Sequence, residues 1–200
     1  MIAFASCIGS MERFTRHAAP ALQRALEPDS QFAELTTDTS ILEVYNEALV
    51  LLHDDVEILD PEHFCERVRT VLSDPEIAIA GAVGARGVTG LNWWDGEVAG
   101  AVIEPRGFLE GDLEDREVDA VDGLLMVLSP WAVKHLRCDT ATFHGFHAYD
   151  VDLCFQARAA GRRVIAADLP VCHHTKGGYG DPWIWKAADD AFRAKWSAAR

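Results

Sequence analysis

The apolar run at residues 48–52, Ala-Leu-Val-Leu-Leu, constrains the fold of this chain more than any other segment. Both of its faces are apolar, and it leads directly into His53, Asp54 and Asp55. Strands that are apolar on both faces belong to sheets covered by helices on both sides. The run therefore predicts a central strand of an α/β protein, with polar side chains at its carboxyl end.

The rest of the chain alternates between short apolar segments and helical patterns. Strands are expected at 2–8, 32–37, 77–83, 163–167 and 171–172, and helices at 10–26, 40–49, 61–73, 130–135, 150–160 and from 182 onward. Residues 84–114 are rich in glycine and acidic residues, so we expect no more than a short strand there, at 98–103. The alternation predicts an α/β fold with a mostly parallel central sheet flanked by helices. No repeat or linker divides the chain, and residues 1–200 are expected to form a single domain.

An excess of acidic residues limits the partners of this chain. The sequence has 32 Asp and Glu against 18 Lys and Arg, which gives a formal net charge of -14. Such a chain repels the phosphates of nucleic acids and anionic membrane surfaces, and no apolar run approaches the roughly 18 residues of a membrane span. The five cysteines are odd in number, scattered and without a CxxC pair. That usage suits reduced thiols in a cytoplasmic protein and argues against a zinc site.

The triplet His53-Asp54-Asp55 is the sharpest candidate for chemistry. Ligands of open α/β sheets gather beyond the carboxyl ends of strands, where carboxylates can hold a divalent ion that bridges phosphate oxygens. An acidic protein that handles a diphosphate needs such an ion. A solvated turn is the alternative interpretation, because aspartate is common wherever strands end.

Two aspartates stand at the start of the helix expected at 150–160. Asp150 could simply cap this helix, which is the commoner role of aspartate at such a position. Asp150 and Asp152 point in different directions, however, so one could cap while the other faces a pocket. A carboxylate in that pocket could accept the proton of an attacking hydroxyl.

Adjacent histidines follow the last expected strand. A single histidine there is usually structural, but His173 and His174 could offer one imidazole to a metal ion that carboxylates hold elsewhere. Lys176 beside them could contact a phosphate.

Two further polar or aromatic pairs lie in the middle of the chain. Asp122-Gly123 interrupts the apolar stretch 118–128, where a buried carboxylate needs a partner; a bulge or turn is the alternative. Trp93 and Trp94 could stack on a sugar or a base, or could anchor their loop by burial.

Taken in order, five segments of the chain resemble a glycosyltransferase of the GT-A (nucleotide-diphospho-sugar transferase) fold. The likeness is to the large family-2-like group of inverting enzymes and its streptomycin-biosynthesis-type branch. The segments are Tyr45-Asn46-Glu47-Ala48, residues 53–58, residues 121–126, residues 149–154 with Ala159-Ala160-Gly161, and His173-His174. Each is short, but their order and spacing are jointly specific.

The resemblance implies a role for each segment. His53, Asp54 and Asp55 match by position the Asp-x-Asp-like motif that binds Mn²⁺ or Mg²⁺ and the diphosphate of the donor. Asp55 and His53 are then expected metal ligands, completed by His173 or His174, and Asp150 falls on the catalytic base. The other expected substrate contacts are Ser6 and Asp38 near the nucleobase and ribose, together with Asp54, Trp93, Trp94, Asp122, Gly123, Asp152 and Lys176.

The expected activity is transfer of a sugar, with inversion, from a nucleoside-diphosphate sugar to a hydroxyl acceptor. Two positions depart from the family pattern: His53 replaces an aspartate, and Tyr149 replaces the glutamate that usually precedes the base. These departures favour the alternative, a nucleotide-binding or protein-interaction module that keeps the fold without turnover. A metal-dependent hydrolase or nucleotidyltransferase is a third interpretation. The oligomeric state is not indicated by the sequence.

Overall fold

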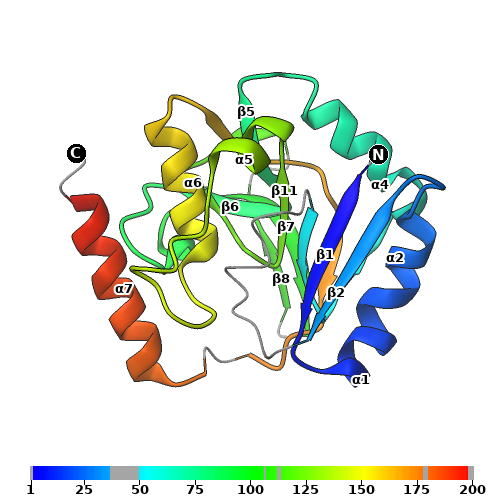
Figure 1. Ribbon diagram of the computed structural model, residues 1–200, viewed down its shortest axis with the longest axis horizontal. Helices are drawn as coiled ribbons and strands as arrows, with labels where there is room; N and C mark the ends of the chain where they lie inside the picture. The colour runs from blue at the N-terminus through cyan, green and yellow to red at the C-terminus, as the bar shows by residue number, and fades with distance from the viewer. Residues whose placement is uncertain (1, 37–49, 106, 112–113, 178–179, 198–200) are drawn as a thin grey trace.

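The computed structural model of the chain describes residues 2–36, 50–105, 107–111, 114–177 and 180–197 (Figure 1). The expected helix at 40–49, the segment Tyr45 to Ala48 and the expected ribose contact Asp38 lie outside these residues.

The main sheet has seven strands in the order β2-β1-β3-β11-β5-β12-β9. The strands β2, β1, β3, β5 and β12 share one direction, whereas β11 and β9 run against them. The expected α/β fold with a mostly parallel central sheet is therefore confirmed. The bounds are β1 (Ala3–Ile8), β2 (Gln31–Thr36), β3 (Val50–His53), β5 (Ile77–Gly81), β9 (Arg116–Glu117), β11 (Leu125–Leu128) and β12 (Arg163–Ala166).

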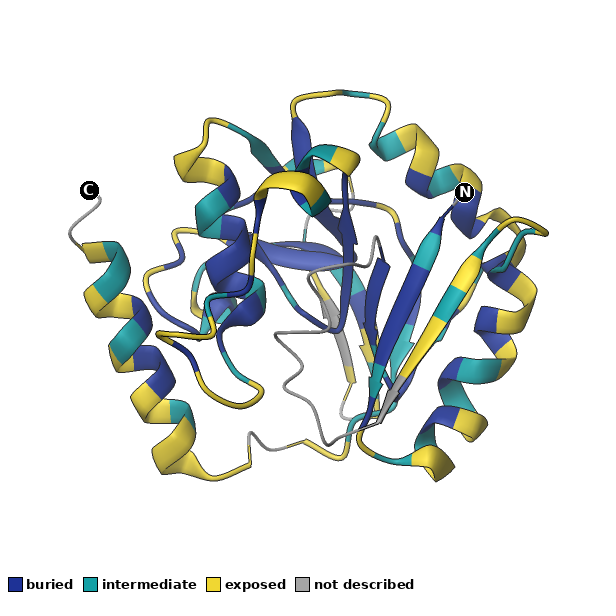
Figure 2. Ribbon diagram, viewed as in Figure 1, coloured by how far each residue is buried: buried dark blue, intermediate teal, exposed yellow. Residues whose placement is uncertain are grey.

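Strand β3 lies in the middle of this sheet, as its apolar sequence predicts. Val50, Leu51 and Leu52 are all 0% exposed, and the neighbouring strands form the buried centre of the molecule (Figure 2). The ring of Phe4 in β1 packs on Phe64, which belongs to a helix on the outer side of the sheet. Both faces of β3 are thus covered, and only its carboxyl end opens toward solvent.

Helices flank the main sheet on both sides (Figure 1). They are α1 (Met11–Arg13), the π-helical η1 (Phe14–Ala18), α2 (Ala19–Ala25), α4 (Pro61–Val71), α5 (Pro130–His135), α6 (Tyr149–Ala159) and α7 (Pro182–Ser197). The side chain of Ser10 caps α1 by accepting from the backbone N–H of Arg13. Pro20 does not end the helical run of residues 11–25; the run instead passes through the π-helical turn η1 directly before Pro20, where Ala19 N–H donates to the carbonyl of Phe14.

A second sheet closes one end of the main sheet. Its order is β10-β6-β7-β13-β4, with β8 paired to β7. The bounds are β4 (Val56–Ile58), β6 (Val83–Arg86), β7 (Glu97–Glu104), β8 (Gly107–Glu110), β10 (Ala120–Val121) and β13 (Val171–His173). The 3₁₀ turn η2 (Trp93–Asp95) lies between β6 and β7.

The short strand expected at 98–103 is present as β7, but the prediction that residues 84–114 hold no further strand is wrong, because β8 and most of β6 lie there as well. Its glycines permit close pairing of the backbone. A Cβ atom at Gly84 would lie 2.2 Å from the carbonyl oxygen of Ala120, and one at Gly100 equally close to that of Ala82. A glycine inside a strand often marks such a close approach of another backbone.

The pair Asp122-Gly123 lies where the chain passes from the second sheet to the main sheet. Strand β10 ends at Val121 and β11 begins at Leu125. The polar interruption is therefore a crossing point between two apolar strands.

Within the described residues, no helix combines the length and apolar character needed to cross a membrane.

Candidate active site

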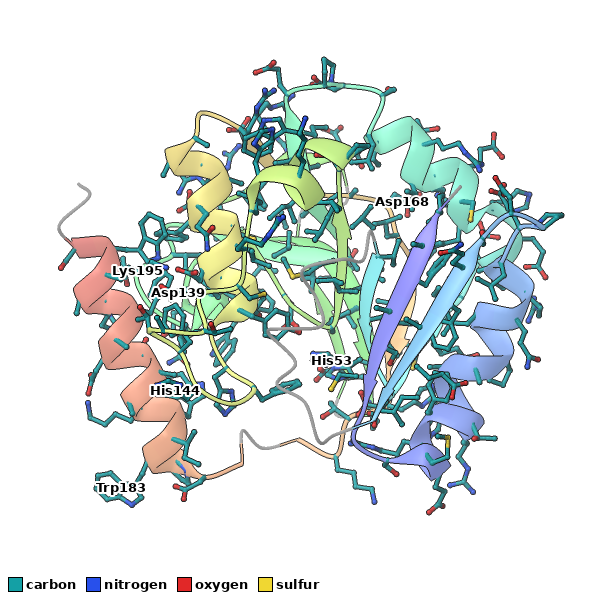
Figure 3. All side chains as sticks on the ribbon, in the orientation of Figure 1. His53, Asp139, His144, Asp168, Trp183 and Lys195 are labelled. Carbon is teal, nitrogen blue, oxygen red and sulfur yellow. The ribbon has the colours of Figure 1, made fainter. Side chains whose placement is uncertain are left out.

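A cavity of about 930 Å³ opens at the carboxyl ends of β1 and β3. Figure 3 shows His53 near the middle of the molecule, between the N-terminal strands and the helices α6 and α7. The described residues that line the cavity include Cys7, Gly9, Arg13, His53, Asp54, Asp55, Trp93, Trp94, Glu104, Asp122, Phe146, Tyr149, Asp150, His173, Thr175, Gly177 and Trp185. Polar groups from segments that are far apart in the sequence thus meet in one place, as expected for the end of a parallel sheet.

His53, Asp55 and His173 each offer one ligand atom, and these three atoms lie within 4.8 Å of one another. His53 is the last residue of β3, and His173 ends β13 of the second sheet. Two imidazole nitrogens and one carboxylate oxygen are donors that suit a divalent transition-metal ion. The residues present therefore fit the metal ion that the family resemblance implies.

Hydrogen bonds orient this cluster. Nε2 of His173 lies 3.3 Å from Oδ1 of Asp55, while Nδ1 lies 3.2 Å from Oε1 of Glu104. Burial acts to raise the pKa of Asp55, but the hydrogen bond from His173 and the nearby positive groups lower it below its usual value. Burial and then the charge of His173 lower the pKa of His53. An ionised carboxylate and a neutral imidazole are the forms that bind metal.

Arg13 bridges the two carboxylates that follow β3. Its guanidinium lies 2.9 Å from Asp54 and 3.3 Å from Asp55. Asp54 also accepts from the backbone N–H of Ser10 at 2.6 Å, so it ties the start of α1 to the end of β3. Among the described residues that line the cavity, Arg13 is the one lysine or arginine. The sequence carried no signal for it, because Arg13 lies 41 residues from Asp54 along the chain.

Asp150 lies in the first turn of α6 and lines the same cavity. The N-cap position is held by Ala148, in the left-handed region at φ 77°, so the capping alternative for Asp150 does not apply. Oδ2 of Asp150 accepts from the backbone N–H of Gly123 at 3.0 Å. Burial and the neighbouring charge of Asp122 raise the pKa of Asp150 to about 7. Such a carboxyl group can take up and release a proton near neutral pH.

Asp122 has the partners that its burial requires. Its Oδ2 accepts from Nε1 of Trp93 at 3.0 Å, and its Oδ1 from the backbone N–H of Leu124 at 2.8 Å. Trp93 is only 4% exposed, so it anchors its loop by burial while one edge borders the cavity. Trp94 borders the cavity as well.

Tyr149 and Glu104 are two site residues that the sequence did not single out as contacts. The hydroxyl of Tyr149 donates to the carbonyl of Gly123 at 2.9 Å and lies 3.0 Å from Nε2 of His53. Gly123 does not line the cavity; it supports the site through its backbone, in place of the expected substrate contact. The position of Tyr149 next to Asp150 was visible in the sequence, but its partners were not.

Two predicted contacts face away from the cavity. Ser6 is 0% exposed and shares the strand face of Phe4, whose ring packs on Phe64, whereas Cys7 on the opposite face lines the cavity. His174 lies 2.8 Å from Glu57 and stacks on His17, outside the cavity. Because side chains alternate along a strand, a neighbour of an inward residue points outward. The structure thus places neither Ser6, the expected ribose contact, nor His174, one of the two expected histidine ligands, in the cavity lining.

Asp152 and Lys176 also lie outside the cavity lining. Asp152 is 1% exposed and lies 2.8 Å from both Nζ of Lys195 and Nε1 of Trp196, which dock α7 on α6. Figure 3 shows Lys195 close to Asp139, a second partner at 2.8 Å. Asp152 is therefore a structural anchor, in place of the expected substrate contact. Lys176 is exposed, while its neighbours Thr175 and Gly177 line the cavity.

Comparison with known proteins assigns the class. A family model described as "Glycosyltransferase like family" matches residues 5–195. The chain belongs to this family, which is family-2-like, and its general activity is glycosyl transfer. The expected GT-A fold, with its large helix-flanked sheet, is confirmed by the same match.

Two individual proteins are similar over most of the chain. The streptomycin biosynthesis protein StrF of Streptomyces griseus is 29% identical over 202 residues, which cover 93% of this chain and 71% of that protein. The crystal structure of A197 from STIV superposes with a TM-score of 0.53 at 14% identity, and covers 88% of this chain and 87% of that one. At that identity the second likeness supports the fold alone.

Proposed function

We propose that the chain transfers a sugar, with inversion, from a nucleoside-diphosphate sugar to a hydroxyl acceptor, with Asp150 as base and a divalent ion at His53, Asp55 and His173. The observation that carries the proposal is that Asp150 lines the same cavity as these three ligands. One cavity then holds both a base for the acceptor and a counter-charge for the leaving diphosphate. These are the two groups that inverting transfer requires.

Asp150 supplies the base. With a pKa near 7, it is partly ionised at neutral pH and can accept the proton of an acceptor hydroxyl as that oxygen attacks the anomeric carbon. The bond from the anomeric carbon to the phosphate oxygen breaks on the opposite face, and the nucleoside diphosphate leaves with the bonding electron pair. The N–H of Gly123 holds Asp150 in place for this step.

The charge on the leaving group needs compensation, because the cavity is acidic. Its described lining carries Asp54, Asp55, Glu104, Asp122 and Asp150 against the single guanidinium of Arg13. A bound divalent ion supplies Lewis-acid stabilisation of the departing diphosphate. Arg13 is then placed to contact a phosphate oxygen while it keeps its pair with Asp54.

The donor set favours Mn²⁺ over Mg²⁺. Magnesium prefers oxygen ligands, whereas imidazole nitrogens suit transition-metal ions. Two of the three candidate ligands are imidazoles. The replacement of an aspartate by His53 therefore changes the preferred ion without removing the site.

A thermal-shift panel tests this proposal. UDP, GDP, TDP and CDP are added with and without Mn²⁺, and the melting temperature is compared with that of the chain alone. Stabilisation by one nucleotide that depends on Mn²⁺ supports the transferase. The absence of any response would instead favour the module that keeps the fold without turnover.

A further inference from the structure

The hydroxyl of Tyr149 lies between the two halves of the candidate active site. It donates to the carbonyl oxygen of Gly123 at 2.9 Å and lies 3.0 Å from Nε2 of His53. Tyr149 is 3% exposed, and Gly123 is buried. The Tyr149 hydroxyl and the Gly123 carbonyl are little exposed, and both have hydrogen-bond partners within the protein.

The number of protons fixes the direction of both hydrogen bonds. A phenol has one proton, and a carbonyl oxygen can only accept. The Tyr149 proton therefore belongs to the bond with Gly123, and the phenol oxygen accepts from His53. Nε2 of His53 then carries the hydrogen, which leaves the lone pair of the neutral ring on Nδ1.

We propose that Tyr149 is a positioning residue that holds His53 in the Nε2-protonated tautomer and so presents Nδ1 to the divalent ion. This inference rests on the proposed function, which assigns that ion to His53, Asp55 and His173. An outer hydrogen bond to a metal-binding histidine fixes its tautomer and the orientation of its ring. This role gives a physical reason for Tyr149 at the position where the family usually has a glutamate before the base.

The second histidine of the site, His173, has a carboxylate rather than a phenol as its outer partner. Nδ1 of His173 lies 3.2 Å from the carboxylate of Glu104, to which it can only donate. In the metal-free chain Nε2 of His173 can donate to Asp55, and a bound ion would take the place of that proton. His53 would then bind through Nδ1 and His173 through Nε2.

Gly123 connects this support to the catalytic base. Its carbonyl accepts from Tyr149, and its N–H donates to Asp150. A Cβ atom at this position would lie 2.2 Å from the Tyr149 hydroxyl, so only glycine leaves room for the contact. The first turn of α6 and the Gly123 backbone thus hold the base and orient a metal ligand together.

The test uses the metal-free chain and needs no sugar transfer. Long-range ¹H–¹⁵N NMR reports which nitrogen of His53 is protonated, with His53→Gln to assign the signal. Electron paramagnetic resonance of free Mn²⁺ gives the affinity of wild type and of Tyr149→Phe. The control is Trp196→Phe, which removes a hydrogen bond to Asp152 on the same helix but outside the cavity.

We expect the Nε2-protonated tautomer in the wild type and a loss of about 10-fold to 100-fold in Mn²⁺ affinity for Tyr149→Phe, with little change for Trp196→Phe. A wild-type His53 protonated on Nδ1, or wild-type Mn²⁺ affinity in Tyr149→Phe, would overturn the positioning role. A wild type with the expected tautomer that binds no Mn²⁺ would refute the metal-dependent function, and with it the role toward the ion. Failure of sugar transfer alone, with the tautomer and the loss of affinity as expected, would refute only the proposed function.

Discussion

Replacing Asp150 with asparagine is expected to make the folded chain more stable at alkaline pH while it removes the base. The folded-state pKa of Asp150 is about 7, against an ordinary value of 3.8, because burial and the charge of Asp122 penalise the carboxylate. An acid with a raised folded pKa binds its proton more tightly in the folded state. Its ionisation therefore lowers the free energy of unfolding as the pH rises from about 4 to about 7.

The size of this effect follows from the two pKa values. Each pKa unit is worth about 1.4 kcal/mol, so the whole interval from 3.8 to about 7 amounts to ~4 kcal/mol. Roughly 1.5 kcal/mol of this is already lost at pH 5, which leaves about 2.5 kcal/mol to be lost between pH 5 and pH 8. Asparagine stays neutral throughout, and its carbonyl oxygen can still accept from the Gly123 N–H.

Urea unfolding at pH 5 and pH 8 in EDTA measures this difference. The stability of Asp150→Asn relative to wild type should increase by about 2.5 kcal/mol between the two pH values, with an unchanged denaturant dependence. Asp190→Asn, at an exposed carboxylate of α7, is the control and should show no such trend. If the stability of Asp150→Asn relative to wild type is the same at both pH values, then burial and Asp122 do not raise the pKa of Asp150, and the reasoning is wrong.

Three further predictions concern the supports of the site. Lys195→Met leaves the carboxylate of Asp152 buried without its cation and should lower the free energy of unfolding by about 2 kcal/mol in a urea titration. The control Lys186→Met removes an exposed pair with Asp190 and should lower the same free energy by only about 0.3 kcal/mol. Gly123→Ala forces a Cβ atom toward the Tyr149 hydroxyl and should weaken Mn²⁺ binding about 10-fold or more in an isothermal titration; wild-type affinity would contradict the close contact. Mn²⁺ at about 100 times its dissociation constant should stabilise the wild type by about 2.7 kcal/mol in thermal unfolding. His173→Ala should abolish this gain, but His174→Ala should keep it, and the opposite pattern would mean that the wrong histidine is assigned.

Much of the framework was predictable because it depends on local pattern. The apolar run before His53 predicted a buried central strand, and the polar triplet after it does lie at the cavity. The start of α6 likewise placed Asp150 at a helix end. Such features follow from strand and helix periodicity, which neighbouring residues determine.

Strand alternation bears on two of the expected site residues, His174 and Ser6. His173 shares a strand face with the buried Val171, which turns His174 to the other side. Ser6 shares its face with Phe4, so Cys7 is the residue turned toward the cavity. Alternation shows which residues share a face of a strand, but a residue of known burial is needed to say which face points into the protein.

The remaining partners depend on contacts between distant segments. Arg13 meets Asp54 across 41 residues, and Tyr149 meets His53 across 96. The link of Asp152 to Lys195 of α7 spans 43 residues and gave no signal in the sequence either. No local pattern encodes such pairs, which arise only when α1, the end of β3, α6 and α7 pack together.

The central claim is that this cavity performs metal-dependent inverting transfer with Asp150 as base. The most direct measurement is turnover of a panel of nucleoside-diphosphate sugars with Mn²⁺, with the anomeric configuration of the first-formed product read by ¹H NMR. We expect nucleoside diphosphate to be released from one donor with an inverted product, and Asp150→Asn to abolish turnover while it still binds the nucleotide. Retained configuration, or wild-type turnover in Asp150→Asn, would contradict the account.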